Sequence, residues 1–165
     1  MTLHDIAALV DQLSDRSGRT REKAREALVD IGPPAVPHLL PLASAPGKKL
    51  RWEVAKTLAD IADPVAIPVL VERLSDQESG IRWLAAVGLI NVGPAAIPAV
   101  LRALIADSLS TGLRRAAHHI FHDLGSEDSA IAGHLAPVLA ALGDIEPADA
   151  IAPKAEEALH WFEPL

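Results

Sequence analysis

Apolar residues recur along the chain with a helical period, and the same phrase returns about every thirty residues. Four copies begin at Arg21, Arg51, Arg82 and Arg114, with spacings of 30, 31 and 32 residues. Each copy places three apolar residues at i, i+4 and i+7: Ala24/Leu28/Ile31, Val54/Leu58/Ile61, Ala85/Leu89/Val92 and Ala117/Phe121/Leu124. This spacing brings them to one face of a helix, so the pattern predicts four equivalent amphipathic helices.

A second apolar run lies between successive copies and predicts a partner helix for each. Gly32-Pro33-Pro34 and Gly93-Pro94 mark the junctions, because Gly suits the residue after a helix and Pro suits the first turn of the next one. The chain therefore divides into helix pairs, whose predicted ranges are 4–15 with 19–31, 35–45 with 49–62, 65–76 with 80–92, 95–107 with 112–124, and 129–142 with 149–162.

The repeats predict an all-α solenoid of about five helix pairs. We expect a single domain over residues 1–165, with repeats at about 4–32, 33–62, 63–93, 94–125 and 126–165. The last repeat is degenerate: its final helix keeps the core register at Ala155, Leu159 and Phe162, but Ala152 stands where the other copies have Arg. A polar terminal repeat is typical of the exposed end of a stack.

One stretch of the third repeat carries a family resemblance. The segment from Asp63 to Asp76, followed by Ile81-Arg-Trp-Leu-Ala-Ala, resembles the short HEAT repeats of phycobilisome-lyase-type bacterial proteins. The resemblance covers residues 4–125 well and 126–165 loosely, and it implies an α-α superhelix. That family includes scaffolds, chromophore-lyase subunits, a metal-dependent hydroxylase and DNA-repair glycosylases, so it does not fix one function.

The resemblance also implies a recurrent pair of Asp and Arg. Each Arg would span the turn between two helices and bond the end of the first one, and we interpret the set as a structural ladder. Repeat two has Ala45 in the acidic position, so we expect Arg51 to be the rung most available to a partner. The ladder comprises Asp15, Arg21, Arg51, Asp76, Arg82, Asp107 and Arg114.

In HEAT stacks the second helix of each pair lines the concave side. Trp52 and Trp83 stand at equivalent places on successive second helices, and Trp is enriched at binding hot spots. The alternative is that both tryptophans pack between repeats. The resemblance thus places a candidate partner-binding surface at Trp52, Trp83, Lys56, Val87, Ile90, Arg115, His119 and His122.

Charge favours a protein partner. The net charge is −7, and residues 126–165 hold one basic and eight acidic side chains, whereas a generic nucleic-acid binder is basic. Basic residues do gather at the turns into the second helices, which keeps nucleic-acid binding along a basic edge as an alternative. That edge comprises Arg16, Arg19, Arg21, Lys23, Arg25, Lys48, Lys49, Arg51, Arg114 and Arg115.

The sequence nominates no catalytic group and no cofactor. Cys is absent, and no apolar run is long enough to span a bilayer, so we expect a cytoplasmic protein. His118 and His122 lie one helical turn apart but lack further ligands, and we expect no metal site. The leading hypothesis is a non-enzymatic scaffold that binds an unidentified protein in its concave groove. The alternatives are nucleic-acid binding and an accessory subunit of a chromophore- or cofactor-handling enzyme.

Overall fold

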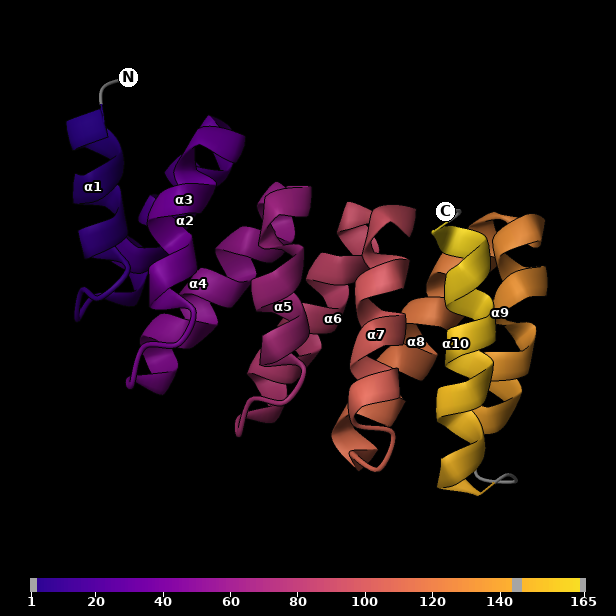
Figure 1. The fold of residues 1–165 in the computed structure, drawn as a ribbon. Helices are drawn as coiled ribbons and strands as arrows, with labels where there is room; N and C mark the ends of the chain where they lie inside the picture. Colours follow the sequence, from indigo (N-terminus) through magenta and orange to yellow (C-terminus); the bar gives the residue numbers. More distant parts are fainter. Residues whose placement is uncertain (1–2, 144–146, 164–165) are drawn as a thin grey trace. The chain divides into compact units, whose positions relative to one another are not determined.

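The computed structural model describes residues 3–143 and 147–163, and every regular element in those ranges is helical (Figure 1). The predicted all-α repeat fold is confirmed, because each of the predicted ranges contains a helix in its described part. Residues 144–146, which fall within the predicted fifth repeat, lie outside the described residues. The chain forms two compact units, residues 1–91 and 92–165. A single domain over the whole chain stays a prediction.

The first unit holds three successive helix pairs. The second helix of each pair is long and regular, whereas the first helix is shorter and, in pairs two and three, begins with a 3-10 turn at Pro33–Ala35 and Pro64–Ala66. The prolines fit there because the first turn of a helix needs no N–H donor. In chain order the helices are α1 (Leu3–Gln12), α2 (Gly18–Ile31), α3 (Val36–Leu39), α4 (Lys48–Ile61), α5 (Ile67–Arg73) and α6 (Ser79–Val92).

The predicted helix stops adopt backbone conformations that favour glycine. Gly32 and Gly93 have φ of 72° and 88°, and Ala62, at the matching place in the second pair, has φ of 55°. Each N–H of Gly32 and Ala62 bonds the carbonyl four residues earlier, at Leu28 and Leu58. These reversals let each long helix end and the following short helix return alongside it.

The core of the first unit is aliphatic, and one glycine brings two long helices close together. Leu28, Leu58 and Leu89 are almost completely buried at corresponding positions of α2, α4 and α6. A Cβ on Gly88 would lie 3.1 Å from the Cα of Ala59 and 3.0 Å from Leu70 Cδ1. Because Ala59 and Gly88 are small, the backbones of α4 and α6 can pack close together at this point.

The second unit contains α7 (Ile97–Ala106), α8 (Thr111–Glu127), α9 (Ser129–Leu142) and α10 (Ile151–Phe162). The sequence predicts the pair 129–142 with 149–162, in which α10 would be the second helix. In the structure α9 packs against α8, and α10 packs against α7 as well as α9 (Figure 1). The last helix thus lies beside a first helix of the preceding pair instead of a second one. The cause is local, because α8 continues through Gly125, which no proline follows, and Asp128 alone separates it from α9.

No single helix within the described ranges is both long enough and apolar enough to cross a membrane. The pair formed by α6 and the segment 94–106 would pass such a test together, on length and composition alone.

Candidate functional site

Three of the recurrent arginines bond the backbone across the turn that precedes their own helix. Arg21 Nη1 donates to the carbonyls of Asp15 and Arg16, at 2.9 and 3.2 Å. Arg51 Nη1 donates to those of Ala45 and Pro46 at 2.9 and 3.1 Å, and Arg82 Nη1 to those of Asp76 and Gln77 at 2.8 and 3.0 Å. The same geometry in three pairs closes the turn at the end of each first helix.

The aspartates of the predicted ladder act on the same turns through their own side chains. Each carboxylate accepts a hydrogen bond from a backbone N–H two or three residues later: Asp15 from Ser17, Asp76 from Glu78, and Asp107 from Ser110, at 2.7, 3.0 and 3.2 Å. Arg114, the fourth rung, has a buried Nε with no partner among the described residues.

The expectation that Arg51 is the free rung is wrong. Its Nε and Nη2 donate to the two oxygens of Asp76, at 2.9 and 3.2 Å, so the guanidinium is already paired with a carboxylate of the next repeat. Burial tends to raise the pKa of Asp76, but hydrogen bonds from Arg51 and the Glu78 N–H, with the charges of Arg51 and Arg73, outweigh it and hold the pKa below its ordinary value. The same hydrogen bond raises the pKa of Arg51.

Glu53 is a buried carboxylate whose pairing with two arginines was not predicted from the repeat pattern. It is only 4% exposed, and its two oxygens accept hydrogen bonds from Arg21 Nε at 2.6 Å and Arg25 Nη1 at 2.7 Å. The sequence does carry a signal: the matching position of the next copy is Leu84, which is buried. A carboxylate at an inward-facing position requires paired cations, and the preceding repeat supplies two.

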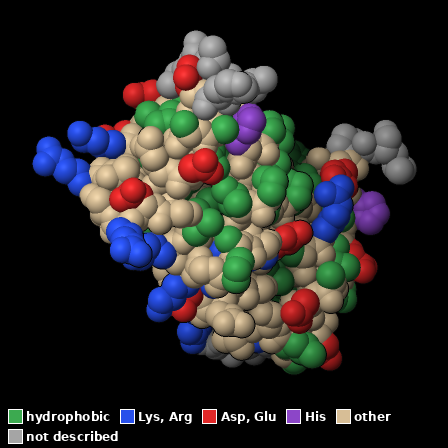
Figure 2. Space-filling model, turned by 90° about the vertical axis from the view of Figure 1, so that its left-hand side faces the viewer, with side chains coloured by type: hydrophobic (Ala, Val, Ile, Leu, Met, Phe, Trp, Pro, Cys, Tyr) green, Lys and Arg blue, Asp and Glu red, His purple; other side chains and the backbone are tan. Residues whose placement is uncertain are grey.

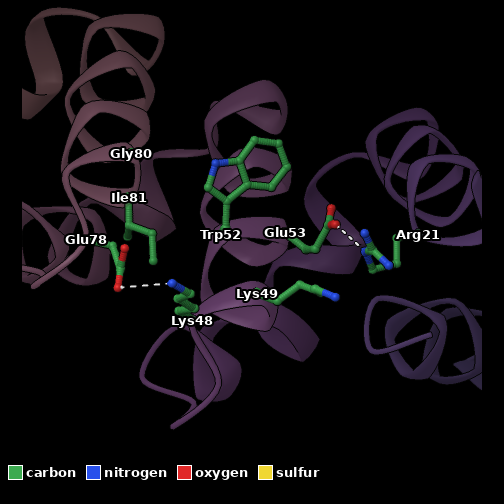
Figure 3. Close-up of a pocket in the computed structure, with 8 residues that line it drawn as sticks. All are labelled: Arg21, Lys48, Lys49, Trp52, Glu53, Glu78, Gly80 and Ile81. Atoms are coloured by element: carbon green, nitrogen blue, oxygen red, sulfur yellow. Dashed lines mark hydrogen bonds and ion pairs between the residues drawn. The ribbon is translucent and has the colours of Figure 1, made fainter. Parts of the chain in front are cut away.

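A cleft of about 360 Å³ opens in the first unit around Trp52 (Figure 3). The Trp52 ring stands at its centre and is 38% exposed, and the Arg25 guanidinium carbon lies 5.4 Å from the ring centroid. Lys48 and Lys49 extend to opposite sides beneath the ring, and Lys48 Nζ lies 3.8 Å from a Glu78 oxygen. The residues that line the cleft are Arg21, Lys48, Lys49, Trp52, Glu53, Glu78, Gly80 and Ile81.

The other predicted surface residues of the first unit differ in exposure. Trp83, on α6, is 57% exposed, whereas Val87 and Ile90 on the same helix are half-buried. Lys56 is half-buried and pairs with Asp60 one turn later, at 2.6 Å. The exposed large hydrophobic side chains among the described residues of this unit are thus the two tryptophans and Val65.

In the second unit the three remaining predicted residues lie on α8. Arg115 and His122 are exposed, and His119 is half-buried. The rings of His118 and His122 stack with centroids 6.3 Å apart, while Asp123 lies 3.9 Å from His119 and 3.8 Å from His122. Within the described ranges no three His, Asp or Glu side chains come together in a geometry that could hold a metal ion.

Several residues of the predicted basic edge lie in the first unit, and some of them form ion pairs with carboxylates of the fold. On the face shown in Figure 2, most Lys and Arg side chains lie along its left-hand edge, some lie at the right-hand side, and hydrophobic side chains lie across the middle. Arg21, Arg25 and Arg51 of the predicted basic edge hold carboxylates. The exposed members in this unit are Arg16, Arg19, Lys23, Lys48 and Lys49.

The chain is similar to a known protein family and to solved structures. The family described as HEAT repeats matches residues 6–90. A chain from the complex of CpcE and CpcF of phycocyanin lyase from Nostoc sp. PCC7120 is similar over 95% of this chain and 99% of that one, with 26% identity and a TM-score of 0.63.

Two engineered proteins are also similar, with TM-scores of 0.47 and 0.46 and identities of 20% and 21%. Those matches cover 98% and 96% of this chain and 80% and 81% of the engineered ones. No curated protein matches the chain.

Proposed function

Because the chain belongs to the HEAT-repeat family, we propose that it is a non-enzymatic scaffold that binds a segment of another protein along its second helices. The family match and the similarity to a subunit of a lyase complex confirm the resemblance to repeats of the phycobilisome-lyase type. They support a repeat scaffold or an accessory subunit. The binding of a partner segment, and its place on the second helices, are our proposal.

One observation carries the proposal: two tryptophans at matching positions of consecutive second helices are open to solvent. Trp52 on α4 and Trp83 on α6 are 38% and 57% exposed. An exposed indole forgoes much of the stabilisation that its burial would bring, so two of them in register within one unit favour a surface that a partner covers. Trp residues at such positions commonly dominate the energy of an interface.

The test is to remove both rings and measure partner capture. The double variant Trp52→Ala/Trp83→Ala should keep its helical circular dichroism but lose the proteins that the wild-type chain retains from an extract of its source cells. A hot-spot residue contributes at least ~2 kcal/mol, so two together predict a loss of affinity of more than ~100-fold. Trp161→Ala is the matched control, because Trp161 is 46% exposed but stacks on His134 in the second unit.

Capture by the Trp161→Ala control should equal that of the wild type. If the double variant also retains the same proteins at the same level, the surface assignment is refuted. The fold would be unaffected by that outcome, since neither tryptophan belongs to the buried core.

A second candidate function rests on the structural similarity. The related chain belongs to a complex of two proteins of phycocyanin lyase, which favours an accessory subunit that works in such a pair. The direct measurement is co-elution of the purified chain with phycocyanin in gel filtration. If the two proteins elute independently at micromolar concentration, direct binding of phycocyanin by this chain on its own is excluded, whereas the scaffold proposal stands.

A further inference from the structure

We infer that the cleft around Trp52 receives an acidic segment of the partner protein, with an apolar side chain against the indole and a carboxylate beside Lys48 and Lys49. This inference rests on the proposed function, since it names the chemistry of the segment that the surface would bind. It follows from the shape, the charge and the hydrogen-bonding capacity of one cleft in the first unit.

The cleft has the size and lining to take an apolar side chain and its neighbour. Its volume of about 360 Å³ lies at the lower end of the range for ligand sites. Trp52 supplies the open apolar wall, and the buried Ile81 lies beneath it. A Cβ on Gly80 would lie 3.7 Å from Trp52 Nε1, so the absence of a side chain at Gly80 leaves the edge of the indole accessible.

The charge around the cleft is positive after its internal pairs are counted. The cleft is lined by three cations, Arg21, Lys48 and Lys49, and by two carboxylates, Glu53 and Glu78, which gives a net charge of +1. The Arg25 guanidinium lies beside the Trp52 ring and adds to the positive charge. Glu53 is buried and forms ion pairs with both Arg21 and Arg25. The Lys48 side chain is 73% exposed, and its Nζ lies 3.8 Å from a Glu78 oxygen. Such a long, solvent-exposed ion pair is weak. A partner carboxylate would therefore meet lysines that are not neutralised within the fold.

Two further features strengthen the attraction for an anion. Lys48 and Lys49 stand in the first turn of α4, where no acidic residue balances them and no side chain caps the helix. The positive end of the helix dipole adds to their charge. In addition, the Trp52 ring is 38% exposed and its Nε1 borders the space beside Gly80, so this N–H can donate to a carboxylate or carbonyl of the partner.

An acidic peptide fits this arrangement better than a nucleic acid does. A nucleic-acid strand needs cations repeated along its backbone, whereas three arginines of the basic edge are already bound to carboxylates of the fold. The cationic side chains at this cleft are local and accompany a single exposed ring. One or two carboxylates beside one apolar side chain match that pattern.

Trp52 itself can report binding. The chain has three Trp and no Tyr, so the variant Trp83→Phe/Trp161→Phe emits from Trp52 alone. We would titrate it with an octapeptide of sequence Gly-Glu-Glu-Leu-Glu-Glu-Leu-Gly, and with matched peptides in which Gln or Lys replaces every Glu. The acidic peptide should change the emission saturably at low salt, at least tenfold more tightly than either control, and should weaken as salt screens the lysines.

Charge reversal separates electrostatic recognition from folding. Lys48→Glu/Lys49→Glu should weaken binding of the acidic peptide at least tenfold. The melting temperature of the variant should stay close to that of the parent, because acidic residues suit the first turn of a helix and this offsets the loss of the weak contact between Lys48 and Glu78. Arg19→Glu/Lys23→Glu is the matched control, with two exposed cations on α2 that do not line the cleft. It should change the affinity by less than about threefold.

Each other occupant would give a distinct result. Equal binding of the Gln peptide, or no effect of the Lys48/Lys49 reversal, would show an apolar site without charge selection and would overturn the inference. Tighter binding of octathymidylate would point to nucleic acid and overturn it as well. A concentration-dependent dimer in sedimentation that Trp52→Ala abolishes would identify a second copy as the occupant and would overturn the inference too.

The inference and the proposed function can fail separately. If no peptide binds but the Trp52→Ala/Trp83→Ala variant still loses its cellular partners, the acidic-segment inference is wrong and the scaffold proposal stands. If neither test shows an effect, both are wrong.

Discussion

Replacing Asp76 by Ala should be among the most damaging single changes at a polar side chain of the first unit. The Asp76 side chain is 3% exposed and accepts two hydrogen bonds from Arg51 and one from the Glu78 N–H, with Arg73 Nη1 3.5 Å away. Removal of this carboxylate leaves the Arg51 guanidinium, 13% exposed, without an ion-pair partner among the described residues, and leaves Arg73, 19% exposed, with only the exposed Glu72 carboxylate at 3.7 Å. Breaking a buried ion pair from one side typically costs 3–5 kcal/mol.

The expected loss lies at the lower end of that range. Arg51 keeps its two bonds to the carbonyls of Ala45 and Pro46, so its charge stays partly solvated by the backbone. The lost turn bond to the Glu78 N–H adds about 1 kcal/mol. We therefore expect Asp76→Ala to lower the free energy of unfolding by about 3 kcal/mol.

The assay is urea unfolding followed by circular dichroism, with Asp15→Ala as the control. Asp15 occupies the same turn position in the first repeat and accepts the Ser17 N–H, but its carboxylate makes no ion pair with a described residue. Its removal should cost about 1 kcal/mol. If Asp76→Ala is no more destabilising than Asp15→Ala, then the Arg51 pair contributes nothing net and the reasoning is refuted.

The same pair makes a pH dependence with a definite sign. The pKa of Asp76 in the folded chain lies below its ordinary value of 3.8, so the unfolded chain binds this proton more readily. The stabilisation is complete above the ordinary pKa and is lost as the pH falls through the lower, folded-state pKa. The difference in stability between the wild type and Asp76→Asn should therefore be constant near neutral pH and shrink in acid below about pH 4. A difference that grows in acid would contradict the assignment.

Three further changes probe packing, backbone conformation and the buried carboxylate, each by thermal or urea unfolding. Gly88→Ala should lower the free energy of unfolding by about 1 kcal/mol, because overpacking outweighs the helical preference for Ala. Gly133→Ala, with open space around it, should raise the free energy of unfolding by up to about 1 kcal/mol. A gain in stability at both sites would refute the close approach of α4 and α6. Ala62→Gly should gain about 0.5–1 kcal/mol because φ is positive there, and an unchanged melting temperature would count against strain. Glu53→Gln should lower the free energy of unfolding by about 2–3 kcal/mol. Glu22→Gln, on the surface, should change it by no more than about 0.5 kcal/mol. Equal effects of the two substitutions would show that Arg21 and Arg25 need no anion.

The helices could be predicted because their information is local. Apolar spacing fixes the inward face of each helix, and a glycine followed by proline fixes where one ends and the next begins. The arginine at the start of each copy was also visible as a repeat. Its carbonyl partners lie five and six residues away, within the same turn.

What the sequence could not supply depends on the register between repeats. Arg51 and Asp76 are 25 residues apart, and the pairing of Arg21 with Glu53 spans 32; both exist only once neighbouring helices pack. The reversal of the last two helices depends on how far α8 continues past Gly125, and a periodic pattern does not determine that length. The cleft around Trp52 likewise combines side chains from three helices and the turn that precedes α6.

The arginine–carboxylate pairs also bear on how the first unit melts. Arg21 and Arg25 of the first repeat hold Glu53 of the second, and Arg51 of the second holds Asp76 of the third. These part-buried arginine–carboxylate pairs thus lie at the boundaries between neighbours and not within one repeat. In a one-dimensional array with strong nearest-neighbour coupling, the members cannot unfold one at a time. The three repeats should lose their structure in one cooperative transition, and an excised single repeat should have no stable fold.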